Sequence, residues 1–173
     1  VQRATVERYT GEGTGLKFPE RDLHLFDGAA FAGWEVSWPY TSDDFRRLDE
    51  NDDAKFYDFP KLVYHIDEGS VSALTRYYDT AIADGSDVLD ICSSWVSHYP
   101  RDFPKRMKSI AATGISEIEL KCNDQLTGGF KPADLNAKPK LPYADGSFDV
   151  VTCVVSFDYL TRPLDVMREV VRV

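Results

Sequence analysis

The sequence predicts an α/β domain with a mainly parallel sheet, preceded by an irregular N-terminal extension. Apolar residues recur at helical spacing across 71–82, which indicates an amphipathic helix. Near-continuous apolar runs at 88–92 and 148–155 are typical of strands that are buried on both faces. Because helical patterns alternate with these runs, we expect parallel strands joined by helices.

Each predicted element has its own start and stop signals. Asp67 or Ser70 caps the first helix, and Asp84-Gly85 ends it. Ser116 caps a helix over 117–123. Thr161 caps the last helix, with Pro163 at its first position. The remaining elements are strands at 88–92, 109–113, 130–134 and 148–155 and a connector or short helix at 104–108.

The composition indicates an ordinary globular domain and argues against two classes of partner. The chain has 173 residues, of which 43% are hydrophobic and 28% are charged. Its 20 basic and 29 acidic residues give a net charge of −9, which makes nucleic acid an unlikely partner. Only 105–108 forms a basic patch. No apolar run approaches the ~18 residues of a membrane span.

Three cysteines, Cys92, Cys122 and Cys153, are widely spaced. Their odd number and spacing favour free thiols in a reducing intracellular compartment over a disulfide framework. They do not match a zinc site either, and we predict no metal site.

The N-terminal extension, residues 1–66, is aromatic and acidic. Trp34 and Trp38 belong to an aromatic cluster, and the segment 41–53 is rich in acids. That segment is either a solvated loop or short helix or a docking surface for a basic partner. We predict that a second domain covers 67–173.

Polar side chains follow the predicted strands at their carboxyl ends, where ligands bind in open α/β sheets. Asp90 and the small residues Ser93 and Ser94 lie at the end of the first strand, and Asp134 lies at the end of the third. Two carboxylates at one crevice suit hydrogen bonds to ribose hydroxyls or to an adenine amine.

Three blocks of the sequence resemble class I S-adenosylmethionine-dependent methyltransferases. They are DVLDICSSW at 87–95, ADL at 133–135 followed by LPYADGSFDVV at 141–151, and the helix that begins at Thr161. Their order and spacing agree with that family. The stretches 56–67 and 95–100 resemble a methyltransferase-like subfamily of bacteria and photosynthetic eukaryotes.

The resemblance implies a Rossmann-like sheet that holds S-adenosylmethionine over the strand ends. Asp90 would lie under the cofactor and fix its amino-acid end. The backbone from Cys92 through Ser93 and Ser94 would approach the cofactor. Asp134 would bind the adenine amine, and Leu135 would contact the ring.

The sequence departs from the family pattern at two places. Cys92 and Ser94 stand where the first motif has glycines, which let the backbone approach the ligand. Gly114 stands where the family has an acid that binds both ribose hydroxyls. Glu117, three residues on, is the predicted replacement.

The family sheet continues beyond the point where this sequence stops, so we expect an incomplete C-terminal half and an exposed edge at 148–155. Three explanations are open: the sequence is part of a longer protein, a partner covers the edge, or the subfamily ends differently.

The sequence thus predicts an S-adenosylmethionine-dependent methyltransferase that acts on an unknown small-molecule or protein acceptor. The alternative is a non-catalytic structural or assembly subunit that contacts other protein subunits through the extension or the sheet edge. The compartment would be the cytoplasm or a plastid stroma. The catalytic residues are unknown, and His98 is either a general base or a loop histidine. The methyltransferase interpretation requires Asp90 and Asp134 to border one crevice that Trp95 does not fill.

Overall fold

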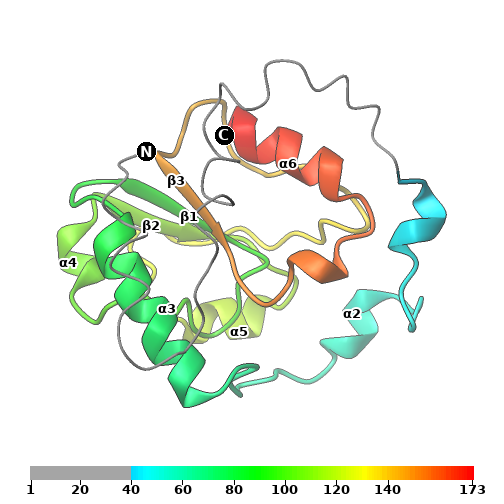
Figure 1. Cartoon of the computed structure of the whole chain (residues 1–173), viewed down its shortest axis with the longest axis horizontal. Helices are drawn as coiled ribbons and strands as arrows, with labels where there is room; N and C mark the ends of the chain where they lie inside the picture. Colours follow the sequence, from blue (N-terminus) through cyan, green and yellow to red (C-terminus); the bar gives the residue numbers. More distant parts are fainter. Residues whose placement is uncertain (1–39) are drawn as a thin grey trace, which may run out of the picture. The chain divides into compact units, whose positions relative to one another are not determined.

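Three parallel strands form the centre of the computed structural model, which describes residues 40–173. They are β1 (Asp87–Ile91), β2 (Ser109–Ala112) and β3 (Val150–Cys153), in the order β2-β1-β3 (Figure 1). Leu89 of the central strand lies opposite Ala111 on one side and Val151 on the other. This confirms the predicted parallel α/β class.

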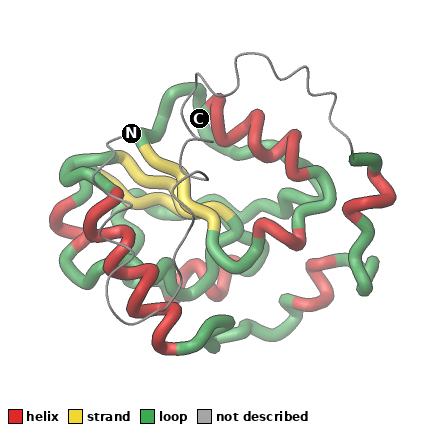
Figure 2. Tube along the Cα trace, viewed as in Figure 1, coloured by secondary structure: helices red, strands yellow, loops and turns green. Residues whose placement is uncertain are grey.

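Helices alternate with the strands along the chain, as the sequence pattern predicts (Figure 2). Within Ser42–Val173, which is one compact unit, the helical elements are η3 (Ser42–Phe45), α2 (Asp53–Phe56), α3 (Glu68–Ala81), α4 (Phe103–Arg106), α5 (Glu117–Cys122), η4 (Phe157–Tyr159) and α6 (Pro163–Arg172). The predicted features at Trp34 and Trp38 lie outside the described residues. The predicted domain boundary after residue 66 stays a prediction.

Two apolar clusters cover the two faces of the sheet. Val88 packs with Tyr78 of α3 on one face, whereas its neighbour Leu89 packs with Val166 of α6 on the other (Figure 1). Because successive side chains of a strand point to opposite faces, both must be apolar when both faces are covered. This arrangement explains the continuous apolar run of β1.

Two of the three predicted helix caps are confirmed. The side chain of Asp67 accepts from Ser70 N at 2.8 Å at the start of α3, and that of Ser116 accepts from Glu119 N at 3.3 Å at the start of α5. The predicted cap at Thr161 is wrong. Arg162 occupies the N-cap position without a capping bond, because Thr161 donates instead to Asn136 Oδ1.

Two strand predictions need correction. The strand predicted at 130–134 is reduced to a single bridge between Phe130 and Ala112. Lys131 N and Ala133 N still donate to Ala112 O and Gly114 O, both at 2.9 Å, so the segment runs beside β2 and its following loop without forming a regular strand. The strand predicted at 148–155 is shorter, and Val155 has a left-handed backbone (φ 58°) that turns the chain away after β3.

Candidate functional site

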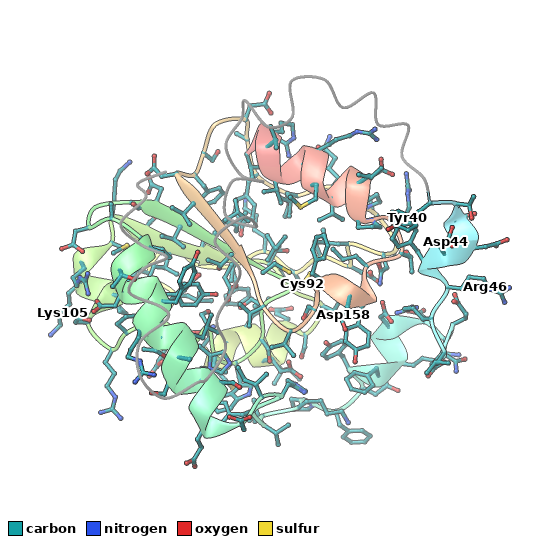
Figure 3. The ribbon with its side chains drawn as sticks, viewed as in Figure 1. Tyr40, Asp44, Arg46, Cys92, Lys105 and Asp158 are labelled. Atoms are coloured by element: carbon teal, nitrogen blue, oxygen red, sulfur yellow. The ribbon has the colours of Figure 1, made fainter. Side chains whose placement is uncertain are left out.

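A cavity of about 1070 Å³ opens at the carboxyl ends of the three strands. Asp90 and Cys92 line it at the end of β1, Gly114 beyond β2, and Val154 and Val155 after β3. The sheet brings these ends together because all three strands run in the same direction. Cys92 and Asp158, which both line this cavity, are labelled in Figure 3.

Asp90 lines the cavity, is only 5% exposed, and holds the loop after β1. Its carboxylate accepts hydrogen bonds from Ser93 Oγ at 2.6 Å and from Thr152 Oγ1 at 3.0 Å. Tyr99 extends this network with a 2.6 Å hydrogen bond to Thr152. Burial raises the pKa of Asp90 to about 6, although these hydrogen bonds oppose the shift.

The loop after β1 packs directly on the loop after β2. Ser93 N donates to Thr113 O at 2.8 Å, and Thr113 N donates to Asp90 O at 2.9 Å. A Cβ at Gly114 would overlap the carbonyl oxygen of Ser93. This close approach explains why glycine stands at residue 114, since any side chain there would displace the Ser93 backbone.

Asp134 begins a turn at another side of the same cavity. Its Oδ1 accepts the amides of Asn136 and Ala137 at 2.8 and 3.0 Å. Within the described residues, Oδ2 makes no hydrogen bond that would occupy it, so it remains available to a donor in the cavity. Leu135, the next residue, is 4% exposed and packs in the apolar cluster under the cavity.

Glu119 brings a third carboxylate to the cavity from α5. It is 1% exposed, and its two oxygens accept from Lys61 N and Ser94 Oγ, both at 2.6 Å. Glu117 lies two residues before Glu119 on the same helix and points away from the cavity. It is exposed and forms an ion pair with Lys121 at 2.7 Å, and it does not line the cavity.

The strap, which we define as residues 42–66, borders the cavity and supplies much of its lining. Asp53 of the strap pairs with Arg47 and accepts from Asn136 Nδ2 at 2.9 Å. At the other end of the strap, Val63 O accepts the indole N–H of Trp95 at 3.1 Å. Hydrogen bonds therefore attach the strap to two different loops of the domain.

Trp95 and His98 line another part of the cavity, and Tyr64 packs against both. Tyr64 of the strap stacks on Trp95 with ring centroids 5.1 Å apart and lies 5.5 Å from the His98 ring. Trp95 therefore forms part of the wall and does not fill the cavity. His98 has a left-handed backbone (φ 59°), and its buried Nδ1 makes no hydrogen bond with any described residue. Burial and the nearby His65 lower the pKa of His98.

The sequence from residue 89 to residue 173 matches the family described as a methyltransferase domain. The match covers 85 of the 173 residues of the chain. The match begins in β1 and ends at the last residue of the chain, so it includes the Asp90 loop and the turn at Asp134.

Solved structures with a similar fold include three that share 17–20% sequence identity with this chain. YcgJ from Bacillus subtilis is 18% identical, with a TM-score of 0.47, and the match covers 61% of this chain and 46% of YcgJ. A SAM-dependent methyltransferase from Aquifex aeolicus is 17% identical over 77% of this chain and 66% of its own, with a TM-score of 0.45.

The third is a methyltransferase from Haloferax volcanii in complex with the Trm112 activator. It is 20% identical over 53% of this chain and 41% of its own, with a TM-score of 0.44. This chain thus spans less than two thirds of the length of each of the three structures. A search of curated proteins finds no match.

Six of the seven predicted cofactor-binding residues line the cavity at the strand ends. The six are Asp90, Cys92, Ser93, Ser94, Asp134 and Leu135. The seventh, Glu117, lies outside the lining, and Glu119 lies inside it. Sequence spacing did not identify Glu119. The spacing does not tell whether Ile118 or Glu119 is the buried residue of this helix, and the contact of Glu119 with Ser94 decides it.

The cysteine in the first motif of the methyltransferase domain adopts a glycine-like backbone. Cys92 has a φ of 52°, in the left-handed region that favours glycine. The conformation expected from the family pattern is thus present although the glycine is not. Its cost for a non-glycine residue is of the order of 1 kcal/mol.

No helix in the stretch 40–173 has the length and apolar character that crossing a membrane would require. Among the same residues, no group of three or more histidine, cysteine, aspartate or glutamate side chains is placed to hold a metal ion.

Proposed function

We propose that the protein is an S-adenosylmethionine-dependent methyltransferase. The observation that carries this proposal is the single cavity bordered by both Asp90 and Asp134 in a chain whose residues 89–173 match the methyltransferase-domain family. S-adenosylmethionine, when bound, supplies a methyl group that is activated by a sulfonium sulfur.

The residues of the cavity fit this group. Ligand pockets commonly measure about 300–1,000 Å³, so a cavity of about 1070 Å³ has room for a cofactor and a small acceptor. The free Oδ2 of Asp134 suits an adenine amine, and buried Leu135 offers an apolar contact beside it. The loop after β1 stays close to the strand ends. Cys92 has a glycine-like backbone, and Ser93 packs directly on Gly114.

We assign the ribose-binding carboxylate to Glu119 in place of Glu117. Glu119 lines the cavity, and each of its oxygens accepts one hydrogen bond, so each retains capacity for a second. Gly114, which stands where the family has its acid, has no space for a side chain. The acid would therefore reach the same cavity from α5.

The acceptor would be a small molecule with an aromatic or apolar portion. The strap borders the cavity and is attached through Asp53 and Val63, so the acceptor would bind between the strap and the strand ends. Trp95 and Tyr57 offer flat apolar surfaces to such a molecule.

His98 would take the proton that the acceptor loses. Burial and His65 favour the neutral imidazole, which is the form that can accept a proton at neutral pH. The acceptor atom would attack the methyl carbon as the bond from carbon to sulfur breaks, and its proton would pass to the imidazole. The protein subunits that we predict as partners and the plastid or cytoplasmic location stay predictions.

Calorimetric titration of S-adenosylhomocysteine into the full chain tests the proposal. Asp134→Asn keeps an oxygen for the backbone amides of the turn and replaces the free Oδ2 with an amino group, which repels the adenine amine. We expect micromolar binding to the unchanged protein and at least a tenfold loss in this variant.

Asp124→Ala is the matched control, because Asp124 is exposed and does not line the cavity. Its affinity should equal that of the unchanged protein. No binding to the folded chain at millimolar ligand would overturn the methyltransferase proposal and favour a non-catalytic subunit.

A further inference from the structure

Two cysteines meet beneath the cavity, at the carboxyl ends of neighbouring strands. Cys92 directly follows β1, and Cys153 is the last residue of β3. Ile91 is the register partner of Cys153, so the two backbones are neighbours at this point. Adjacent strands lie about 4.8 Å apart, and disulfides join Cα atoms about 4.4–6.8 Å apart.

The backbone of Cys92 brings its thiol to the same face as the thiol of Cys153. In a regular strand, the residue after Ile91 would point to the opposite face. The left-handed conformation of Cys92 (φ 52°) breaks this alternation. Cys92 and Cys153 accordingly pack against the same apolar cluster, which also contains Ile91 and Leu89.

The two thiols also influence each other's ionisation. The neighbouring thiol of Cys153 raises the pKa of Cys92, and burial acts in the same direction. The neighbouring thiol of Cys92 lowers the pKa of Cys153, against the effect of burial. A thiol that ionises readily beside one that stays protonated is typical of reactive dithiol pairs.

We propose that Cys92 and Cys153 form a reversible disulfide that closes the cavity to its ligand. The oxidant is a low-molecular-weight disulfide, RSSR. One cysteine thiolate attacks a sulfur of RSSR and releases one thiol, and the second cysteine displaces the other thiol from the mixed disulfide. The two protein thiols are oxidised, RSSR is reduced to two RSH, and the two protons lost by the cysteines end on the released thiols.

The bond would act on the ligand through the loop that follows Cys92. Ser93 packs on Gly114, and Ser94 donates to Glu119, so both depend on the backbone position of Cys92. Tying Cys92 to β3 would pull this loop away from those contacts. The disulfide itself does not depend on the proposed function, whereas its effect on S-adenosylhomocysteine binding rests on it.

Peptide mapping of the full chain, equilibrated with glutathione disulfide and kept folded, tests the bond. We expect a Cys92–Cys153 disulfide in the unchanged protein and in Cys122→Ser, whose cysteine is exposed and lies elsewhere on α5. It should be absent in Cys92→Ser and in Cys153→Ser. Mixed disulfides alone, or bonds only to Cys122, would overturn the proposal.

Titration of S-adenosylhomocysteine into reduced and oxidised Cys122→Ser protein tests whether the disulfide closes the cavity. We expect at least a tenfold weaker affinity after oxidation, with full recovery in dithiothreitol. Equal affinities would show that the disulfide does not close the cavity, even if the bond forms. If the reduced protein did not bind S-adenosylhomocysteine, the proposed function and the proposed effect of the disulfide on binding would both fail. Peptide mapping would still decide whether Cys92 and Cys153 form a disulfide.

Discussion

Gly114 lies so close to Ser93 that a Cβ on the glycine would overlap the serine carbonyl oxygen and lie 3.1 Å from the carbonyl carbon. The contact joins the loops after β1 and β2 at the cavity. The atoms of Ser93 that the Cβ would meet belong to its backbone, so rotation of a side chain cannot relieve the clash.

Gly114→Ala should therefore destabilise the fold by about 1–3 kcal/mol, the usual cost of overpacking. Urea unfolding followed by circular dichroism measures the change. Gly146→Asn is the control, since a Cβ at Gly146 meets nothing within 4 Å and asparagine tolerates its φ of 62°. A Gly114→Ala variant as stable as this control would contradict the close approach.

Two glutamates on α5 provide a matched pair of variants. Glu119→Gln should weaken S-adenosylhomocysteine binding about tenfold or more, because the charge that would accept the ribose hydroxyls is lost. Glu117→Gln should leave the affinity unchanged, because Glu117 is exposed and pairs with Lys121. Calorimetry compares the two, and a larger effect of Glu117→Gln would reverse the assignment.

Asp90 gives the stability of the protein a specific pH dependence. Its carboxyl has a pKa of about 6 in the folded protein and 3.8 when unfolded, so the folded state holds its proton more tightly. Its contribution to stability is present in full below pH 3.8 and is lost as the pH rises through about 6, a difference of about 3 kcal/mol.

Asp90→Asn removes this titration and keeps the size of the side chain. The free energy of unfolding of the variant relative to the unchanged protein should therefore rise by up to about 3 kcal/mol between pH 4 and pH 7. Urea titrations at several pH values measure this difference. A difference that stays constant with pH would show that Asp90 ionises normally in the folded protein.

Asn136 attaches the strap to the cavity. Its Nδ2 donates to Asp53 Oδ2 at 2.9 Å and to Tyr159 O at 3.0 Å. Asn136→Ala should free the strap, so amide hydrogen exchange should accelerate across 42–56 while β1 stays protected. Asn51→Ala is the control, because the Asn51 side chain bonds only to Asp49 within the strap. Unchanged exchange in Asn136→Ala would show that other contacts hold the strap.

The sequence determined the elements whose signals are local. The apolar run at β1 and the caps at Asp67 and Ser116 depend on neighbours a few residues away, and the structure has each where the sequence predicts it. Asp90 lies in the apolar run of β1 and lines the cavity, as the sequence predicts. Asp134 lines the same cavity although the strand predicted to end there is reduced to a single bridge.

The tertiary structure decided what depends on residues far apart in the chain. Glu119 lies at the cavity because Ser94 and Lys61, which are 25 and 58 residues away, reach its carboxylate. Cys92 and Cys153 share a face because β1 pairs with β3 and the Cys92 backbone is left-handed. Helical or strand periodicity records which residues are buried along one element, but it does not record which elements meet, because that depends on the packing of the whole domain.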